Sequence, residues 1–392
     1  MGPQGINVSE SASCDVSIVS HLPLQRRGGG MYAVTAEVTG QLRRHFRDVV
    51  FLKIPTPADY SAMLLSRVNR RLLGRRGSFF PFSPRVLTQV ARQVAASVPS
   101  GCRQILFRSA TRWIRCRPAQ PYFVHLDAPF SLYCRNKQAE LQFLKADLQR
   151  IQDEEAEFLE GAAGVFFESE WGREHALRDY QLRGNQYLTV GVAGGLQRPE
   201  VVQPFDPSKP LRLLTIAKHF RQKGGDLTGA AYRLLKPEFP DLTWHVIGGS
   251  PDSACRGMPG MFPEGQLNPD AATDAGRYHS LLDGNAILVH PTREDMNPLV
   301  LIEAAQFGCP VISVRDFAIP ELVRDGETGL LLDRPLTPDA IAKAIRSLLL
   351  NPARLQSMSE QAVRFAEQSF SWDAIGQRMV GAMAGRTGDG RN

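Results

Sequence analysis

The chain alternates short apolar runs with longer stretches of helical period, and this alternation occurs in two successive series. In the first half, strand-like runs are expected at 14–20, 48–54, 121–126 and 163–169, with helical stretches at 31–46 and 145–162. In the second half, strand-like runs are expected at 211–217, 242–249, 285–291, 310–314 and 329–333, with helices beginning near Asp226 and Pro298. Strands that alternate with helices form parallel sheets covered by helices. The sequence therefore predicts an α/β fold.

A segment rich in proline and glycine separates the two series. It runs from Gly194 to Pro210 as GGLQRPEVVQPFDPSKP and has no helical or strand period, so we interpret it as a domain linker. We expect an N-terminal domain at 1–200 and a C-terminal domain at 201–370, both Rossmann-like and facing each other across a cleft. In such sheets, ligands bind outside the carboxyl ends of the strands.

Composition excludes several classes of protein. The 392 residues are 43% hydrophobic and 22% charged, which is typical of soluble globular proteins. No apolar run approaches the roughly 20 residues of a membrane span, and the start of the chain lacks a secretory signal, so we expect a cytoplasmic protein. The six cysteines are far apart without a C-x-x-C pair, and neither Asp-x-Asp nor H-E-x-x-H occurs, so we expect no metal site and no disulfide framework.

One segment is strongly basic. Between Asp59 and Asp127 there is no acidic residue, while twelve arginines fall between Arg67 and Arg117. Within it, SAMLLSRVNRRLLGRRG has the pattern of a basic amphipathic helix. Three readings stay open: a solvated surface helix, contact with an anionic membrane or acceptor (a peripheral position on the inner face of the membrane), and, least favoured, nucleic-acid binding. The last lacks the aromatic residues that accompany nucleic-acid sites, so we expect no nucleic-acid partner.

Two carboxylates flank the start of a predicted helix in PTREDMNPLVLIEAAQFG. Asp295 is expected in the loop at the carboxyl end of a strand, and Glu303 one to two turns into the helix, where both can reach a ligand. A helix N-terminus binds anions through its N–H groups, here those of Met296, Asn297, Leu299 and Val300. Amides for a diphosphate beside carboxylates for hydroxyl groups suit a nucleotide-sugar. The alternative is that Asp295 only caps the helix and that Glu303 is an exposed helical residue.

This stretch resembles the signature of the retaining GT-B glycosyltransferases of family GT4, in which two acidic residues lie eight positions apart before A-x-x-x-G-x-P-V-I. The pattern continues here in IPELVRDGETGLLL. Asp295 stands where the family usually has Glu, and Pro298 replaces a glycine. The resemblance covers most of the chain and is strongest from about 211 to 333. It implies the GT-B fold, an acceptor-side N-terminal domain, a C-terminal domain that binds the nucleotide-sugar, and a last helix in 371–392 that crosses back to the N-terminal domain.

The resemblance also assigns site residues. TIAKHFRQKGGD resembles the motif that contacts the diphosphate, with Lys218 at the family's Arg position and Lys223 at its Lys position. Gly29 and Gly30 occupy the place of a Gly-Gly loop near the donor phosphate. His125, at the end of PYFVHL, matches a histidine near the transferred sugar, with Asp127 as a second candidate. By itself, a histidine in a strand is more often a core residue, and each lysine a surface residue.

The function implied is retaining transfer of a sugar from a nucleotide diphosphate sugar to a glycan, lipid-linked or small-molecule acceptor. The implied catalytic residues are His125, Asp127, Lys223 and Asp295. The implied donor-binding residues are Gly29, Gly30, Lys218, Lys223, Asp295, Met296, Asn297, Leu299, Val300 and Glu303. The donor is a co-substrate, and no further cofactor or metal is expected. The alternative is a noncatalytic GT-B subunit that binds a glycan or a partner enzyme. A dehydrogenase is less favoured because no G-x-G-x-x-G follows the first strand.

Overall fold

The structure is a computed structural model that describes residues 14–25, 30–197, 201–202 and 205–387. Contacts divide the chain into two compact units. The first unit contains residues 1–25, 35–191 and 372–392, and the second contains 26–34 and 192–371. Each unit is built around one six-stranded sheet. The Gly29 position of the predicted glycine loop lies outside the described residues.

The sheet of the first unit is parallel, with strand order β2-β1-β3-β4-β5-β6. Its strands are β1 (Cys14–Ser20), β2 (Val49–Lys53), β3 (Cys102–Arg108), β4 (Tyr122–Leu126), β5 (Gly164–Phe167) and β6 (Tyr187–Thr189). Its helices are α1 (Met31–His45, of which residues 35–45 belong to this unit), α2 (Tyr60–Arg71), α3 (Pro84–Ser97), α4 (Phe130–Asn136), α5 (Ala139–Gln142), α6 (Lys145–Glu160), α7 (Glu170–Asp179) and α14 (Trp372–Thr387), with a 3-10 turn at Phe80–Phe82.

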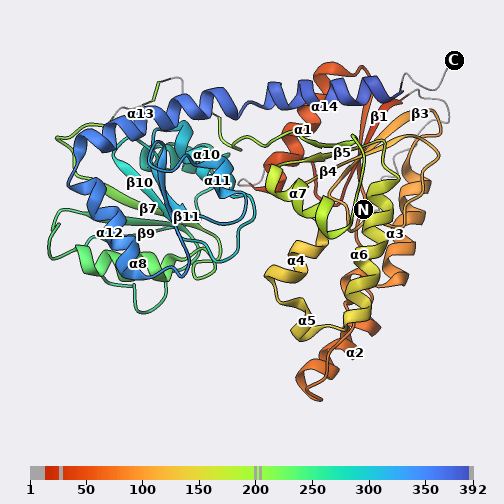
Figure 1. Ribbon diagram of the computed structural model, residues 1–392, viewed down its shortest axis with the longest axis horizontal. Coiled ribbons are helices and arrows are strands. Elements are labelled where there is room, and N and C mark those ends of the chain that lie inside the picture. The colour runs from red at the N-terminus through yellow and green to blue at the C-terminus, as the bar shows by residue number, and fades with distance from the viewer. Residues whose placement is uncertain (1–13, 26–29, 198–200, 203–204, 388–392) are drawn as a thin grey trace. The chain divides into compact units, whose positions relative to one another are not determined.

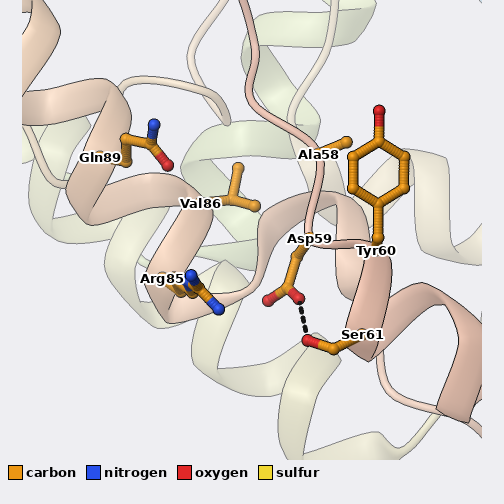
Figure 2. Close-up of a pocket in the computed structure, with 7 residues that line it drawn as sticks. All are labelled: Ala58, Asp59, Tyr60, Ser61, Arg85, Val86 and Gln89. Atoms are coloured by element: carbon orange, nitrogen blue, oxygen red, sulfur yellow. Dashed lines mark hydrogen bonds between the residues drawn. The ribbon is translucent and has the colours of Figure 1, made fainter.

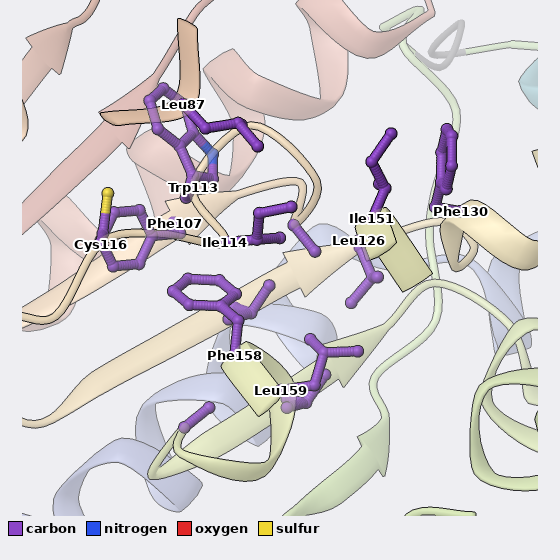
Figure 3. Packing of buried hydrophobic residues seen from close by; sticks show 14 of the residues in the cluster. Leu87, Phe107, Trp113, Ile114, Cys116, Leu126, Phe130, Ile151, Phe158 and Leu159 are labelled. Atoms are coloured by element: carbon purple, nitrogen blue, oxygen red, sulfur yellow. The ribbon is translucent and has the colours of Figure 1, made fainter. Parts of the chain in front are cut away.

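The main core of this unit lies between the sheet and the helices α3 and α6. Leu87 of α3 and Phe158 of α6 pack with Phe107 of β3, and all three side chains are fully buried. Figure 3 shows this cluster, to which Trp113 is added from the loop after β3. The Gln41 side chain of α1 donates a hydrogen bond to Asp373 of α14, which joins the last helix to this unit. Both faces of this sheet are covered, so six of the seven residues of β1 are buried, the small polar Ser17 and Ser20 among them.

The sheet of the second unit is also parallel, with strand order β12-β11-β10-β7-β8-β9. Its strands are β7 (Arg212–Ala217), β8 (Thr243–Gly248), β9 (Met261–Gly265), β10 (Ala286–His290), β11 (Val311–Val314) and β12 (Gly329–Leu332). Its helices are α8 (Gly225–Leu235), α9 (Ala272–Leu281), α10 (Leu299–Gln306), α11 (Ile319–Leu322), α12 (Pro338–Leu349) and α13 (Pro352–Ser369), as Figure 1 shows. This is the strand order of dinucleotide-binding folds, and it reverses between β7 and β10.

The core of the second unit lies mainly between α8, α12 and one face of the sheet. Tyr232 of α8 and Ile345 of α12 pack with Trp244 of β8. A smaller cluster joins α10 to α13 through Ala305, Ala362 and Ala366. The predicted α/β fold with two Rossmann-like domains is therefore confirmed.

The start of the predicted linker is not loose. Residues 192–196 are buried, and the Gly195 N–H donates a hydrogen bond of 3.0 Å to the carboxylate of Glu303. A Cβ atom on the preceding Gly194 would lie 2.7 Å from Oε1 of Gln306, so only glycine permits this approach to α10. The glycines that suggest flexibility in the sequence thus allow the chain to pack tightly here.

Three strands, β3, β6 and β9, were not predicted from the sequence. Neither were eight helices: α3, α4, α5, α7, α9, α11, α12 and α13. Helix α2 is shorter than its pattern indicates. The basic pattern of the sequence continues to Gly77, but the helix ends at Arg71 because the chain turns between Leu72 and Gly74. In the part of the chain that the structure describes, no helix has the length and apolar character needed to cross a membrane.

Candidate functional site

Three side chains meet where the strand order of the second sheet reverses. Asp295, in the loop after β10, forms an ion pair with Lys223, in the segment between β7 and α8. The imidazole Nε2 of His290, the last residue of β10, lies 3.2 Å from Oδ2 of the same carboxylate. Crevices at such reversal points bind ligands in open α/β sheets. The structure therefore brings together the two predicted residues Lys223 and Asp295.

The environment of Asp295 keeps its carboxyl group ionised. Burial raises the pKa of Asp295, but the hydrogen bond with His290 and the positive charge of Lys223 outweigh this effect, so its pKa lies below the ordinary value. The side chain pairs with two basic groups, whereas the N-terminus of α10 has no side-chain cap. The alternative that Asp295 serves only as a helix cap is therefore wrong.

The loop that carries Asp295 is fixed to the segment after β7. Gln222 donates a hydrogen bond of 2.7 Å to the Glu294 carboxylate, and Lys223 donates one of 3.2 Å to the Glu294 carbonyl. Arg293 binds both oxygens of Asp226 at 2.8 and 2.9 Å. A bidentate pair of this kind limits rotation as well as separation. These contacts fix the loop after β10 against the segment after β7, next to the Lys223–Asp295 ion pair.

A cavity of about 550 Å³ lies beside the carboxyl ends of β7 and β8. Lys218 and Glu303 both line it, together with Tyr278 of α9. The Glu303 side chain is buried and accepts the hydrogen bond from Gly195, so the alternative of an exposed helical residue is wrong. Burial and the negative charge of Glu303 together raise the pKa of Tyr278 well above its ordinary value.

The rest of the cavity wall offers both apolar and polar groups. Ile216, Ile247 and Leu267 supply apolar surface, while Gln266 and Asn268 supply amide groups. Apolar walls with a few polar groups are typical of small-molecule sites. Within the described ranges, no group of three or more His, Cys, Asp or Glu side chains is placed to hold a metal ion.

The predicted anion-binding amides lie at the start of α10. Met296 and Asn297 are in the loop, and the Met296 carbonyl accepts a hydrogen bond of 3.0 Å from the Ala318 N–H. Leu299 and Val300 are the first two residues of the helix. Pro298, which we expected at the first helical position, is instead the residue before it, with ψ of 101°. Its extended conformation turns the chain out of the Asp295 loop.

His125 lies in the interior of the first unit rather than on its surface. Its side chain is fully buried in β4, and the guanidinium of Arg108 in β3 donates to its Nδ1. The hydrogen of a neutral imidazole is then on Nε2, which has no partner within the described part of the chain. Glu168, directly after β5, lies 3.6 Å from Nδ1 of His125 and 3.7 Å from Arg108.

Asp127, the second candidate, directly follows β4 and is half-buried. Burial and the charge of Glu168 raise the pKa of Asp127 to about 6, against the opposing effect of Arg108. His21 follows β1, and burial together with the charges of Arg112 and Arg108 lowers its pKa to about 4. Both groups therefore lie at the carboxyl edge of the first sheet, where its strand order also reverses, between β1 and β3.

Four polar residues at the carboxyl edges of the two sheets were not predicted from the sequence: His21, Arg108 and Glu168 in the first sheet and His290 in the second. Each is the last residue of a parallel strand or follows one directly. That position is the signal that could have found them, because the carboxyl ends of parallel strands meet at one edge of the sheet. Gly30, the described residue of the predicted glycine pair, precedes α1 with φ of +62° and has open space around a Cβ position.

The two Rossmann-like units define a protein of the GT-B class. Among solved structures, the chain is similar to sucrose-phosphate synthase from Thermosynechococcus elongatus, with a TM-score of 0.68 and 17% identity over 95% of this chain and 98% of that one. At this identity the likeness describes the fold alone.

Sequence comparison then indicates a family. Residues 198–365 match the model of the family "Glycosyl transferases group 1". The match covers 168 of the 392 residues, so the second unit is similar to this family.

Two curated relatives match parts of the chain. The D-inositol 3-phosphate glycosyltransferase of Rhodococcus opacus is 39% identical over 105 residues, which are 27% of this chain and 22% of that protein. The GDP-mannose-dependent alpha-(1-6)-phosphatidylinositol monomannoside mannosyltransferase of Mycolicibacterium smegmatis is 26% identical over 189 residues, which are 42% of this chain and 45% of that protein. The matches thus span less than half the length of each relative.

Proposed function

We propose that the protein is a glycosyltransferase that moves a sugar from a nucleotide diphosphate sugar to a hydroxyl group of an acceptor, with retention of anomeric configuration. The observation that carries this proposal is the arrangement in the second unit. A cavity lined by Lys218 and Glu303 opens beside the carboxyl ends of β7 and β8, and the Lys223–Asp295 pair lies at the reversal of strand order.

Each of these groups has a chemical role in the proposal. Glu303 is an acceptor for the hydroxyl groups of the ribose, and Lys218 offers a positive charge at the mouth of the same cavity. Lys223 has three N–H donors, and its contacts to described residues use two of them, for Asp295 and the Glu294 carbonyl. The third can donate to an oxygen of the leaving diphosphate. Asp295, held ionised, can accept from a hydroxyl of the transferred sugar.

Sugar transfer requires that the leaving diphosphate be stabilised as the bond to the sugar breaks. Fixed positive groups do this best, because they need no reorganisation as charge develops. The ion pair with Asp295 and the contact with Glu294 fix the position of the Lys223 ammonium before donor binds. In a retaining transfer of this kind, a phosphate oxygen of the leaving group accepts the proton of the acceptor hydroxyl. No strong protein base is then required.

The names of the curated relatives suggest the kinds of substrate to test. One relative is named for D-inositol 3-phosphate, and the other for GDP-mannose and phosphatidylinositol monomannoside. Both acceptors carry phosphate groups. We therefore place GDP-mannose among the first donors and phosphorylated or lipid-linked polyols among the first acceptors, with glycans and uncharged small molecules for comparison.

The test is a panel of UDP-, GDP- and ADP-sugars, scored by thermal shift and by release of nucleotide with and without acceptor. We expect one nucleotide class to raise the melting temperature and one of its sugars to be consumed. NMR of the product anomer then distinguishes retention from inversion. A shift with no turnover for any acceptor would instead support the noncatalytic GT-B subunit, and no shift with any nucleotide would contradict donor binding.

A further inference from the structure

One end of the first unit combines exposed leucines with exposed arginines. We call it the basic tip, and it comprises Leu64, Leu65, Leu72, Leu73, Leu141 and Leu144 with Arg67, Arg71, Arg75 and Arg76. Figure 1 shows its two segments, α2 with the turn after it and α5, at the same end of the unit. The Gly77 N–H donates to the Gln142 carbonyl at 3.0 Å, and the Leu144 N–H donates to the Gly77 carbonyl at 2.9 Å. The two segments are therefore side by side.

The leucines of the basic tip are unusually exposed for their type. Leu72 is 76% exposed and Leu141 is 69% exposed, although leucine is normally among the most buried residues. Eight leucines are strongly exposed in the described parts of the chain, and six of them belong to the tip. The other two are Leu234 and Leu350 in the second unit. Single exposed apolar residues are ordinary, but a cluster of this size marks an interaction surface.

The structure divides the arginine-rich segment into two parts. Toward its C-terminal end the arginines have partners inside the unit: Arg115 pairs with Glu154, Arg117 pairs with Glu157, and Arg108 is buried against Glu168. At the tip, by contrast, Arg67, Arg71, Arg75 and Arg76 are exposed and form no ion pair with any described residue. Arg85 and Arg92 of α3 and Arg103 of β3 are exposed as well, so solvent-facing arginines also occur outside the tip. In the part of the chain that the structure describes, only at the tip do exposed arginines lie beside a cluster of exposed leucines.

The acidic residues near the tip are already engaged. Asp59 caps the start of α2, where it accepts hydrogen bonds from the Ala62 N–H at 3.0 Å, from Ser61 at 2.8 Å and from Ser83 at 3.0 Å. Figure 2 shows Asp59 facing Ser61 beside Arg85 of α3. Glu140 pairs with Lys145, and Asp147 accepts from the Phe79 N–H. None of these carboxylates pairs with an arginine of the tip within the described residues.

We propose that the basic tip docks the protein on the surface of an anionic lipid bilayer. The leucines enter the boundary between headgroups and acyl chains, and the arginines contact the lipid phosphates around them. Apolar residues beside arginines are the pattern of segments that lie in a membrane interface. A second copy of this chain fits the surface less well, since two such tips would bring like charges together. Docking does not depend on the proposed reaction.

The mode of attachment of α2 supports this role. Ser66 of this helix is buried and donates to the Ser78 carbonyl at 2.8 Å. The Arg70 guanidinium lies 4.8 Å from the centre of the Phe143 ring and donates to Gln142 at 3.1 Å. One face of the helix is thus fastened to the unit while the other presents Leu64, Leu65 and Arg71. A surface that keeps its shape in this way binds without the entropic cost of ordering.

The first experiment uses the fact that all six native cysteines are buried. Leu72→Cys and Leu350→Cys are each labelled with an environment-sensitive fluorophore and mixed with vesicles of phosphatidylcholine containing 30% phosphatidylglycerol, or of phosphatidylcholine alone. We expect a blue shift for the label at 72 with the anionic vesicles and none for the label at 350. Equal shifts at both positions, or no shift at position 72, would overturn the proposal.

The second experiment measures binding to the same vesicles by flotation. The triple variant Arg71→Gln, Arg75→Gln, Arg76→Gln is compared with Lys343→Gln, Arg354→Gln, Arg364→Gln, which removes the same charge from exposed positions of the second unit. Each arginine near an anionic surface contributes about a fivefold factor. We therefore expect about 100-fold weaker binding for the tip variant and less than a twofold change for the control.

The apolar part of the surface is tested in the same way. Leu72→Ser with Leu73→Ser is compared with Leu234→Ser and Leu350→Ser, the two exposed leucines elsewhere. We expect a loss of at least tenfold only for the tip variant, with unchanged melting temperatures for both. Binding of the wild-type protein to an acidic protein but not to vesicles would contradict the proposal. So would equal binding to vesicles with and without phosphatidylglycerol.

Discussion

Lys223 and Asp295 form an ion pair between the two strands where the order of the second sheet reverses. Lys223 lies in the segment after β7, and Asp295 in the loop after β10. These two strands are neighbours in the sheet but are separated in the chain by β8, β9 and two helices. The pair therefore joins the first and second halves of the nucleotide-binding fold. It places a positive charge and an ionised carboxylate at the position where such folds bind their ligands.

The first prediction is that Lys223→Ala lowers kcat by a factor of about 100 to 1,000. In the proposed mechanism the lysine supplies a fixed positive charge to the leaving diphosphate, and losses of this size follow removal of one such group. Steady-state kinetics with the donor found in the panel measure the change. Lys209→Ala, which removes an exposed lysine from a surface pair with Asp206, is the control and should keep the wild-type rate. A near-normal rate for Lys223→Ala would contradict the proposal that this lysine stabilises the leaving diphosphate.

The second prediction concerns Glu303, which we expect to act mainly on donor binding. Glu303→Gln keeps the size of the side chain and an oxygen that can accept from Gly195, but it loses the negative charge. Hydrogen bonds to a charged acceptor are roughly twice as strong as those to a neutral one. We therefore expect at least tenfold weaker binding of the nucleotide, measured by calorimetry. The control is Gln356→Glu, which adds a negative charge at an exposed position of α13 and should leave nucleotide affinity unaltered.

The third prediction is that activity does not require a divalent metal ion. In the proposed mechanism, Lys218 and Lys223 balance the charge of the diphosphate. Treatment with EDTA followed by assay in metal-free buffer should leave the initial rate within about twofold of its starting value. Loss of activity that Mg²⁺ or Mn²⁺ restores would show that a metal shares this role.

Much of the fold could be predicted from sequence because most strands are buried on both faces. β1 has the predicted bounds of 14–20, and β7, β10, β11 and β12 lie inside the predicted runs. β3 was missed because only Ile105, Leu106 and Phe107 form its apolar run, between Arg103 and Arg108. β9 contains Pro263 and is partly exposed at the sheet edge, where proline is tolerated, so its sequence has little strand character.

The site was predicted only in part, because spacing does not show which groups meet in space. The family pattern indicated Asp295 and Lys223, but nothing in it shows that His290 shares the Asp295 carboxylate. Likewise, the pattern placed His125 near the sugar, whereas the structure shows it enclosed and paired with Arg108. The assignment of catalytic roles to His125 and Asp127 remains a prediction. Asp127, with its half-exposed position, is the more accessible of the two.

The fourth prediction follows from the raised pKa of Asp127. Burial and the charge of Glu168 raise this pKa from 3.8 to about 6 in the folded protein. The folded state therefore binds a proton more tightly than the unfolded state, so this group lowers stability as the pH rises from about 4 to about 6. Above that range the carboxylate is ionised in both states, and the folded protein carries the full cost of its partial desolvation and of the repulsion by Glu168. Below it, the group is protonated in both states and contributes little.

Asp127→Asn should remove this cost, since an amide is uncharged at every pH and keeps an oxygen that can accept from the Ala128 N–H. We expect the variant to melt several degrees above the wild type at pH 7.5 and at nearly the same temperature at pH 4. Asp241→Asn, at an exposed position, should show no such difference between the two pH values. A variant that is less stable than the wild type at pH 7.5 would mean that the ionised carboxylate stabilises the fold, through Arg108, more than its burial costs.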